Sequence, residues 1–372
     1  MHNTLKGNTV LSRKQCDVLR GLAIIGIFLH NFCHWLHGCH AENEYVFYKE
    51  HGLTSWNYWT GGGVDGFAPI QFFSFLGHYG VPLFLFLSGF GLVMKYEHKD
   101  SKHVKILPFL GAHWMKLFKL MFLGYILSVL VYDVWCGFDF HPWYEVVAQL
   151  TMVVNFIFDS PGNALMPGPY WFFGLMFEVY IIYRLVLYST RGKSLWRWLM
   201  PLLLIAIAWL LMMPCSNHPR LLNYLRYNAT VAMLPFAMGV LIARYGLPHV
   251  PKWVLAVVAI ASLPLISIAN LNFQAWLWAP VLVVAGSVAF VKLFDGNTAQ
   301  LLFKPLAWMG TLSSFIFVVH SLPRMPMFKF VLWRQQHLMY TDYAWLAAYI
   351  ILTIILAWLY KHYMKLLNNR KL

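Results

Sequence analysis

Long apolar runs separated by short polar segments fill most of the sequence. Ten runs reach or approach the roughly 20 residues that a helix needs to cross a bilayer. They lie near residues 18–36, 72–94, 117–135, 171–188, 198–214, 229–244, 253–270, 275–294, 306–323 and 341–361. The pattern predicts an all-α fold, a polytopic integral membrane protein of about ten transmembrane helices. We expect a single domain, 1–372, without an appended soluble domain.

One further apolar run, 146–158, is too short to cross and is followed by the turn residues 159–163. We expect it to be a re-entrant or interfacial segment. Charge supports this interpretation. If the run does not cross, most of the 28 Lys and Arg residues, including the basic loop 191–197, fall on one side. The positive-inside rule then places both termini in the cytoplasm and the long loop 37–71 outside.

Composition agrees with a membrane location. The chain is 60% hydrophobic and only 11% charged, whereas soluble domains carry about 25% charged residues. We therefore expect membrane lipids around the helices. The net charge of +14 does not indicate a nucleic-acid partner, because the basic residues lie in short loops rather than on one soluble face. The first run is too long for a cleaved signal and is expected to be retained.

The five cysteines show neither a CxxC motif nor zinc-site spacing. Cys39, Cys136 and Cys215 fall in or near loops that we predict to be outside. A disulfide among these three residues is compatible with the sequence but is not required by it.

The first apolar run contains unusual ionisable residues. Arg20 opens the run, and His30 follows ten residues later, about 15 Å further along a helix and near the middle of the membrane. His34 lies one turn beyond. Charged groups inside a membrane are costly and often functional. A histidine there can accept a hydroxyl proton near neutral pH; alternatively, it is packed and bonded to a neighbouring carbonyl.

The same stretch also offers possible metal ligands. His30 and His34 have the i, i+4 spacing of a helical ligand pair, and His37, Cys39 and His40 follow closely. The helix itself contains no evident third ligand. We therefore predict no metal site.

Later spans add four more candidates. Glu178 is the only carboxylate well inside a predicted span, so it either pairs with a charge or is protonated. Ser88 and Gly89 lie near the inner end of the second span. These small residues allow close helix packing or open room for a ligand chain. His320 ends the ninth span at the outer third of the membrane, where it is either functional or a packing residue.

Cations cluster where the third span begins. His113, Lys116 and Lys119 recur every three residues at the inner membrane face. Lysines at this depth ordinarily anchor a helix by reaching the interface. They also offer a binding site for an anionic ligand.

Four of these segments together resemble the acyltransferase-3 family, bacterial membrane proteins that O-acylate surface carbohydrates. The matching blocks are Asp17 to Gly21 followed by a histidine, Tyr79 to Phe90, Trp171 to Tyr180, and Gly310 to His320. Each block alone is a weak signal, but the four occur in the family's order. The resemblance covers nearly the whole chain.

The resemblance implies a function for this chain. The donor would be a cytosolic acyl-CoA, expected to be acetyl-CoA, and the acceptor a hydroxyl of an extracytoplasmic glycan or lipid-linked sugar. The protein would lie in the bacterial cytoplasmic (inner) membrane. The catalytic residues are expected among His30, His34, Arg20, Glu178 and His320, with a first-span histidine as the base. Donor binding is expected at Arg20, Ser88, His113, Lys116 and Lys119.

The chain departs from the family pattern in two places. The family's histidine usually lies eleven residues after the arginine, where this chain has Asn31. His30 is one residue earlier, which turns its side chain by about 100° around the helix. His34 lies nearer the family's expected face and is a competing candidate. At the inner face, histidine and lysines replace the family's arginines, and lysine binds phosphate as a point charge without a bidentate fork.

Two other functions are compatible with intramembrane charges. A proton-coupled transporter or flippase of a glycan or small anion also uses such groups, although the sequence shows no inverted repeat. A structural subunit of a surface-polymer assembly is the other alternative. Neither explains the four ordered blocks.

Overall fold

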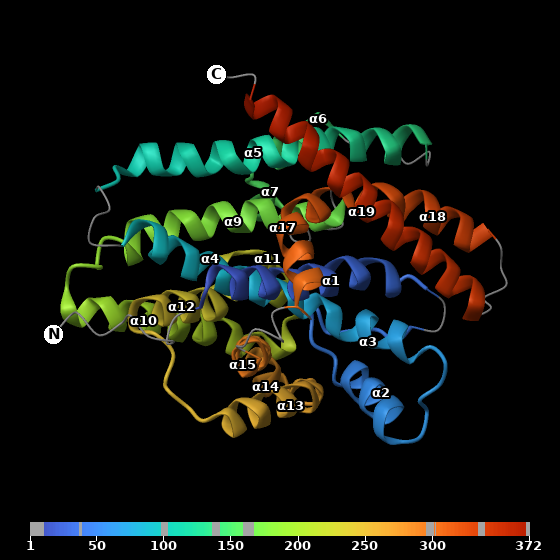
Figure 1. Ribbon diagram of the computed structural model, residues 1–372, viewed down its shortest axis with the longest axis horizontal. Coiled ribbons are helices and arrows are strands. Elements are labelled where there is room, and N and C mark those ends of the chain that lie inside the picture. The colour runs from blue at the N-terminus through green and yellow to red at the C-terminus, as the bar shows by residue number, and fades with distance from the viewer. Residues whose placement is uncertain are drawn as a thin grey trace.

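The computed structural model describes residues 11–36, 39–97, 103–135, 142–158, 167–294, 301, 303–333 and 339–369. Every regular element in these ranges is a helix, which confirms the predicted all-α class (Figure 1). The helices, including short 3₁₀ and π turns labelled η, are α1 (Arg13–Cys33), α2 (Lys49–Thr60), α3 (Ala68–Leu76), η1 (Gly77–Tyr79), α4 (Gly80–Tyr96), α5 (Ile106–Leu130), η2 (Val131–Trp135), α6 (Trp143–Leu150), α7 (Val154–Ile157), η3 (Gly168–Tyr170), α9 (Trp171–Ile182), η4 (Tyr183–Leu187), α10 (Ser194–Met212), η5 (Met213–Asn217), α11 (Pro219–Tyr227), α12 (Ala229–Tyr245), α13 (Lys252–Ala269), α14 (Phe273–Leu277), α15 (Ala279–Leu293), α17 (Lys304–Val319), α18 (Ser321–Trp333) and α19 (Met339–Asn369).

Fewer than ten of these elements meet the length and hydropathy of a membrane span. Within the described ranges, 7 helices do so, and up to 9 if each of two bent helix pairs is one span. The bent pairs are α11 with α12, at 48°, and α17 with α18, at 54°. The predicted span 275–294 corresponds to α15, which has only 15 residues. The predicted count of ten is therefore supported only in part.

The segment 146–158 agrees with the expectation that it does not cross. It contains most of α6 and all of α7, which have 8 and 4 residues. Met152, between the two helices, has a φ of 64°, a left-handed conformation that interrupts a right-handed helix. Neither helix is long enough to span the hydrocarbon core.

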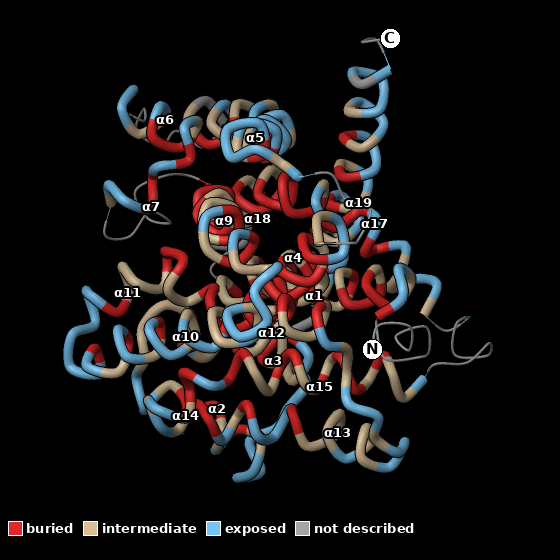
Figure 2. Tube along the Cα trace, turned by 90° about the vertical axis from the view of Figure 1, so that its left-hand side faces the viewer, coloured by how far each residue is buried: buried red, intermediate tan, exposed pale blue. Residues whose placement is uncertain are grey.

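The spans divide into an inner and an outer group (Figure 2). In α1, Ala68–Tyr96 and Gly168–Leu187, between 61% and 67% of the most apolar stretch is buried within the protein. In the spans built on α5, α10, α13 and α19, that share is between 17% and 28%. These outer helices expose many large apolar side chains, as expected for surfaces in contact with lipid.

The central helix α1 begins with a capping box and packs closely against α17. The Gln15 amide donates to Ser12 Oγ at 3.2 Å, and the Ser12 amide donates to Gln15 Oε1 at 2.8 Å. Gly21 faces the backbone of Leu306, and Gly310 faces the backbone of Asp17. A side chain at either glycine would clash with the facing backbone. These two glycines therefore set how near α17 lies to the helix that carries His30.

The pair α4 and α12 uses the same device. Gly89 faces the Phe236 carbonyl, and Gly239 faces the Phe86 carbonyl. The neighbouring Ser88 donates its hydroxyl to the Phe84 carbonyl at 2.8 Å within its own helix. Ser88 and Gly89 were expected either to allow close helix packing or to open room for a ligand chain. For Gly89, the structure shows close helix packing.

Segments predicted to share the cytoplasmic side meet at one end of the bundle. Arg244 forms a buried ion pair with Glu97, its Nη2 lying 2.8 Å from the Glu97 Oε1. Arg244 also donates to the Arg197 and Leu187 carbonyls. A cytoplasmic location for both termini stays a prediction. The predicted topology puts the segments that contain Glu97, Arg197 and Arg244 on one side of the membrane, and these contacts agree with that grouping.

The long loop before α3 is held against the opposite end. Asn43 Nδ2 donates to Asn270 Oδ1 at 3.3 Å, and Trp276 Nε1 donates to the Asn43 carbonyl at 3.0 Å. Asn270 Nδ2 in turn donates to the Tyr79 hydroxyl at 3.0 Å. Asn43 is fully buried. This network fixes the position of its two neighbours, Glu42 and Glu44.

Cys39 and Cys215, the two described candidates for the disulfide that the sequence left open, are not bonded to each other. Cys39 and Cys215 are free thiols. Cys39 donates to the Cys33 carbonyl at 3.0 Å, and Cys215 donates to the Leu211 carbonyl at 3.4 Å. The third candidate, Cys136, lies outside the described residues.

Candidate active site

His30 is held in one orientation by a backbone carbonyl. Its side chain lies in the last turns of α1 and is 2% exposed. Nδ1 lies 2.8 Å from the Ser74 carbonyl oxygen. Because a carbonyl only accepts, Nδ1 must carry the proton, and Nε2 is left as the reactive nitrogen. Gly77 makes this approach possible, since a side chain there would clash with the His30 Cβ.

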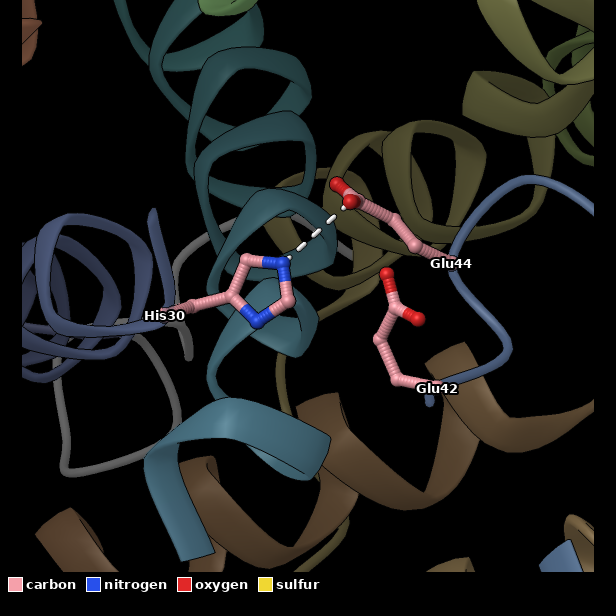
Figure 3. Close-up of side chains that lie close together, drawn as sticks. All are labelled: His30, Glu42 and Glu44. Carbon is pink, nitrogen blue, oxygen red and sulfur yellow. Dashed lines mark hydrogen bonds and ion pairs between the residues drawn. The ribbon is translucent and has the colours of Figure 1, made fainter. Parts of the chain in front are cut away.

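The reactive nitrogen faces a carboxylate. His30 Nε2 lies 3.3 Å from Glu44 Oε2, an ion pair when the ring carries two protons (Figure 3). Because Nδ1 already donates its proton to Ser74, the Nε2 of a neutral ring is an acceptor. It would then face a second acceptor, the Glu44 carboxylate. The contact therefore requires a proton between His30 and Glu44. A ring that gains a proton at Nε2 is stabilised by the Glu44 charge.

A second carboxylate completes the group. Glu42 and Glu44 both point from the loop toward the His30 ring (Figure 3). One ligand atom from each of the three residues lies within 4.8 Å of the others. Burial, and then the negative charge of Glu44, raise the pKa of Glu42. The donor set of one imidazole and two carboxylates can hold a divalent ion, but a metal on Nε2 would prevent that nitrogen from accepting a proton.

The metal ligands that the sequence suggested near His30 do not form a cluster like that of His30, Glu42 and Glu44 among the described residues. His34 Nδ1 donates to the His30 carbonyl at 2.6 Å, within the helix end. Cys39 is bonded to a backbone carbonyl. His37 lies outside the described residues. The absence of a metal stays a prediction.

His34 remains close to His30 but is placed differently. The two ring centroids are 4.8 Å apart. His30 lines the hollow beside α1, and so does Asn31, the residue at the family's usual histidine position. Asn31 Nδ2 donates to the Ile27 carbonyl at 2.9 Å, and its Oδ1 accepts from Arg324 Nη1 at 2.8 Å. Of the two histidine candidates, the geometry favours His30 as the base.

The site opens onto two adjoining hollows. Both hollows have Glu44, Tyr45, His78 and Trp171 among their lining residues. The smaller hollow reaches His30. Substrate groups in this space would lie directly beside the His30 and Glu44 pair.

His78 is a third histidine at the cavity. Its ring centroid is 5.3 Å from that of His30, and the side chain is 4% exposed. Neither ring nitrogen makes a hydrogen bond of good geometry with a described residue. His78 is thus able to bond a hydroxyl of a bound substrate.

Glu178 lies within the helix packing. Its Oε2 accepts from the Ala229 amide at 2.7 Å, and its Oε1 accepts from Asn155 Nδ2 at 3.4 Å. Ala229 is the first residue of α12, where free amides and the helix dipole favour a negative charge. This arrangement caps α12 and joins it to α7 and α9.

His320 lies one layer behind the cavity. It is fully buried, and its Nδ1 donates to the Phe317 carbonyl at 2.8 Å. Phe317 itself lines the smaller hollow. The His320 Nε2 has no hydrogen-bond partner among the described residues. The structure therefore places His320 behind Phe317 rather than in the cavity wall.

Of the predicted donor-binding residues, Arg20 lies in the first half of α1, and His113, Lys116 and Lys119 lie on α5. Arg20 Nη1 lies 2.7 Å from Asp17 Oδ1, in a pair that is partly exposed. Lys116 lies within electrostatic reach of the positive charges of Lys95 and Arg20. His113 lies within reach of those of Lys95 and Lys116.

One turn beyond Lys116, Lys119 is exposed. Ser88 is partly buried, and its Oγ is 3.9 Å from the Met176 sulfur. The structure thus places Lys116 near Arg20 and His113 near Lys116. It places Ser88 in the packing of α4.

These features define a polytopic helical membrane protein with a buried histidine facing a carboxylate at an internal cavity. The family model of the acyltransferase family 3 domain, described as an acyltransferase domain, matches residues 13–362. The chain belongs to this family and is a membrane acyltransferase. Among curated proteins and solved structures, none matches the chain significantly.

Four site residues were not among the candidates from the sequence. Glu42, Glu44 and His78 surround the His30 ring, and Arg226 lines the larger hollow. The first two are acidic residues of the long loop 37–71, and no sequence spacing connects them to His30. His78 directly precedes the second family block at Tyr79. No sequence pattern singled out Arg226.

Proposed function

We propose that this protein transfers an acyl group, in the first instance acetyl, from cytosolic acyl-CoA to a hydroxyl of an extracytoplasmic glycan or lipid-linked sugar. Its location would be the bacterial inner membrane. The observation that carries the proposal is the geometry of His30, whose Nδ1 is fixed by Ser74 and whose Nε2 faces Glu44 and the cavity.

This geometry supports a general-base reaction. Once the proton held between His30 and Glu44 in the free enzyme has been released, the neutral His30 Nε2 takes the proton from the acceptor hydroxyl, and the Glu44 carboxylate stabilises the resulting imidazolium. The hydroxyl oxygen attacks the thioester carbonyl and forms the new ester bond. When the carbon–sulfur bond breaks, the proton on Nε2 passes to the departing thiolate, which restores the neutral ring.

The donor would bind at the cationic end of α1. Arg20, His113, Lys116 and Lys119 would hold the coenzyme phosphates. Arg20 and His30 are ten residues apart on one helix, or about 15 Å. An extended acyl-CoA would bridge this distance, with its phosphates near the cations and its thioester near His30.

Transfer across the membrane can be measured in sealed vesicles that contain the protein in one known orientation. Labelled acetyl-CoA is supplied only on the cytoplasmic side, and a glycan acceptor only on the other side. We expect labelled ester on the acceptor. If product forms only when both substrates share one compartment, transfer does not cross the membrane, although the protein remains an acyltransferase.

A further inference from the structure

The cavity beside His30 contains a cation that the proposed reaction does not use. Arg226, on α11, lines the larger hollow together with Glu44, Tyr45 and Trp276. Its guanidinium carbon lies 4.3 Å from the centroid of the Trp276 ring. Its Nε is buried without a hydrogen-bond partner, and its side chain forms no ion pair with any residue in the described part of the chain.

Arg226 is half-buried, and a guanidinium that is shielded from water without a counter-ion is energetically unfavourable. The negative charge of Glu44 acts on Arg226 through the cavity, but the Oε2 of that carboxylate already faces His30. The Trp276 face contributes a cation–π contact and leaves Nε without an acceptor. An anion bound in the cavity would supply both the missing charge and an acceptor for Nε.

The rest of the cavity wall suits a sugar ring. Tyr45 and Trp171 line both hollows, and Trp171 Nε1 donates to the Tyr45 hydroxyl at 3.1 Å. Behind them, Tyr227 stacks on Tyr45 with ring centroids 4.5 Å apart. Rigid aromatic faces of this kind present an apolar surface with polar edges, which complements the apolar face and hydroxyls of a carbohydrate.

We propose that Arg226 binds an oxyanion carried by the acceptor, so that the enzyme acylates an acidic sugar in preference to a neutral one. A planar guanidinium holds a carboxylate or a phosphate with two parallel hydrogen bonds. The oxyanion is the carboxylate of a uronic-acid residue or the phosphate of a sugar phosphate. This inference rests on the proposed function, since it concerns the acceptor of that reaction.

The donor phosphates do not explain the position of Arg226. Of the predicted donor cations, Lys116 lies near Arg20, whereas Arg226 shares its cavity with Glu44 and His78, close to His30. Arg226 therefore lies toward the His30 end of α1, away from Arg20. Arg226 acts in this account as a specificity-determining residue and takes no proton.

Binding to the full-length protein in lipid nanodiscs, measured by calorimetry without acyl-CoA, tests the proposal. The probes are methyl glucuronoside, glucose 1-phosphate and the neutral methyl glucoside. We expect at least one acidic probe to bind about tenfold or more tightly than the glucoside, the effect of hydrogen bonds to a charged group. Arg226→Gln should remove this preference and leave glucoside binding nearly unchanged. The acidic probe that is preferred identifies carboxylate or phosphate as the group bound.

Two further variants complete the experiment. Arg220→Gln removes an exposed cation from the same helix and should keep the preference. Arg226→Lys retains the charge without the fork and should lose most of the preference for the carboxylate. If Arg226→Gln does not fold, the Arg226→Lys variant alone tests whether the guanidinium binds the oxyanion. The proposal is overturned if either Arg226 variant keeps the full preference, or if the wild-type protein binds neither acidic probe better than the glucoside.

The outcome can be separated from that of the proposed reaction. His30→Ala should slow acyl transfer by about 10²- to 10⁴-fold without changing the preference for the acidic probe. A wild-type protein that prefers the acidic probe but transfers no acyl group would contradict the reaction and leave the anion site standing. A wild-type protein that transfers the acyl group but shows no preference for an acidic probe would contradict the anion site and leave the reaction standing.

Discussion

At the residue scale, the site depends on how one imidazole is oriented. The Ser74 carbonyl fixes the Nδ1 proton of His30, so all acid–base chemistry of this ring falls to Nε2. Glu44 faces that nitrogen, and Glu42 lies beside both. The family motif marks the helix that carries the histidine. The partners come from a loop, where no spacing rule connects them to His30.

The first prediction concerns Glu44. Glu44→Gln removes the charge that stabilises the His30 imidazolium but keeps the size of the side chain. We expect kcat to fall by about 10- to 100-fold, the range for a lost hydrogen bond to a charged group, with little change in KM for acyl-CoA. Steady-state kinetics measure both constants. Glu50→Gln, an exposed change on α2, is the control, and an unaltered kcat in Glu44→Gln would exclude the role of Glu44.

A second prediction concerns Glu42 and pH. Burial and the charge of Glu44 raise the pKa of Glu42, so the folded protein holds this proton more tightly than the unfolded chain does. The folded state is therefore favoured most below the ordinary carboxyl pKa, and it loses stability as pH rises through the range up to the raised pKa. Thermal unfolding in detergent should show this decline. Glu42→Gln should flatten it, and an identical slope in wild type and variant would contradict the argument.

At the element scale, the apolar runs predicted most helices, because a span needs about 20 apolar residues wherever it lies in the bundle. The failures have local causes. Asn228 separates α11 from α12, and Asn228 Nδ2 donates to the Asn155 and Tyr224 carbonyls, which fixes the break. The 15-residue α15 is shorter than the apolar run that contains it. Hydropathy does not record such breaks.

Some glycines of the family blocks allow two helices to pack closely and take no part in the reaction. Gly310→Ala should destabilise the protein by about 1–3 kcal/mol, the usual effect of overpacking, because a methyl group there meets the Asp17 backbone. Gly91→Ala is the matched control, since the space at Gly91 is open. Thermal unfolding midpoints compare the two variants. Equal midpoints would mean that α1 and α17 are not packed as described.

At the scale of the whole molecule, the two ends of the bundle have different characters. The segments around Glu97, Arg197 and Arg244 meet at one end, and the loop around Asn43 is held at the other. The sequence predicted this division from the distribution of Lys and Arg. It did not predict the cavity, because the cavity is formed by side chains far apart in the chain, such as Glu44 and Arg226.

This polarity leads to a prediction about the donor. Reversing both Lys116 and Lys119 to Glu should weaken acyl-CoA binding, and wild-type binding should weaken as salt screens the phosphates. Calorimetry on the purified protein gives both results. Lys252→Glu, an exposed change at the start of α13, should have little effect. Binding by the double variant that equals wild type would place the coenzyme elsewhere.

The central claim is that His30 is the base, and turnover of paired histidine variants tests it most directly. His30→Ala should remain folded and inserted but lose about 10²- to 10⁴-fold in turnover, the range for removal of a general base. His34→Ala should retain much more activity, because its ring bonds a backbone carbonyl at the helix end. A His34→Ala variant without activity, beside a His30→Ala variant with near-normal turnover, would contradict the account.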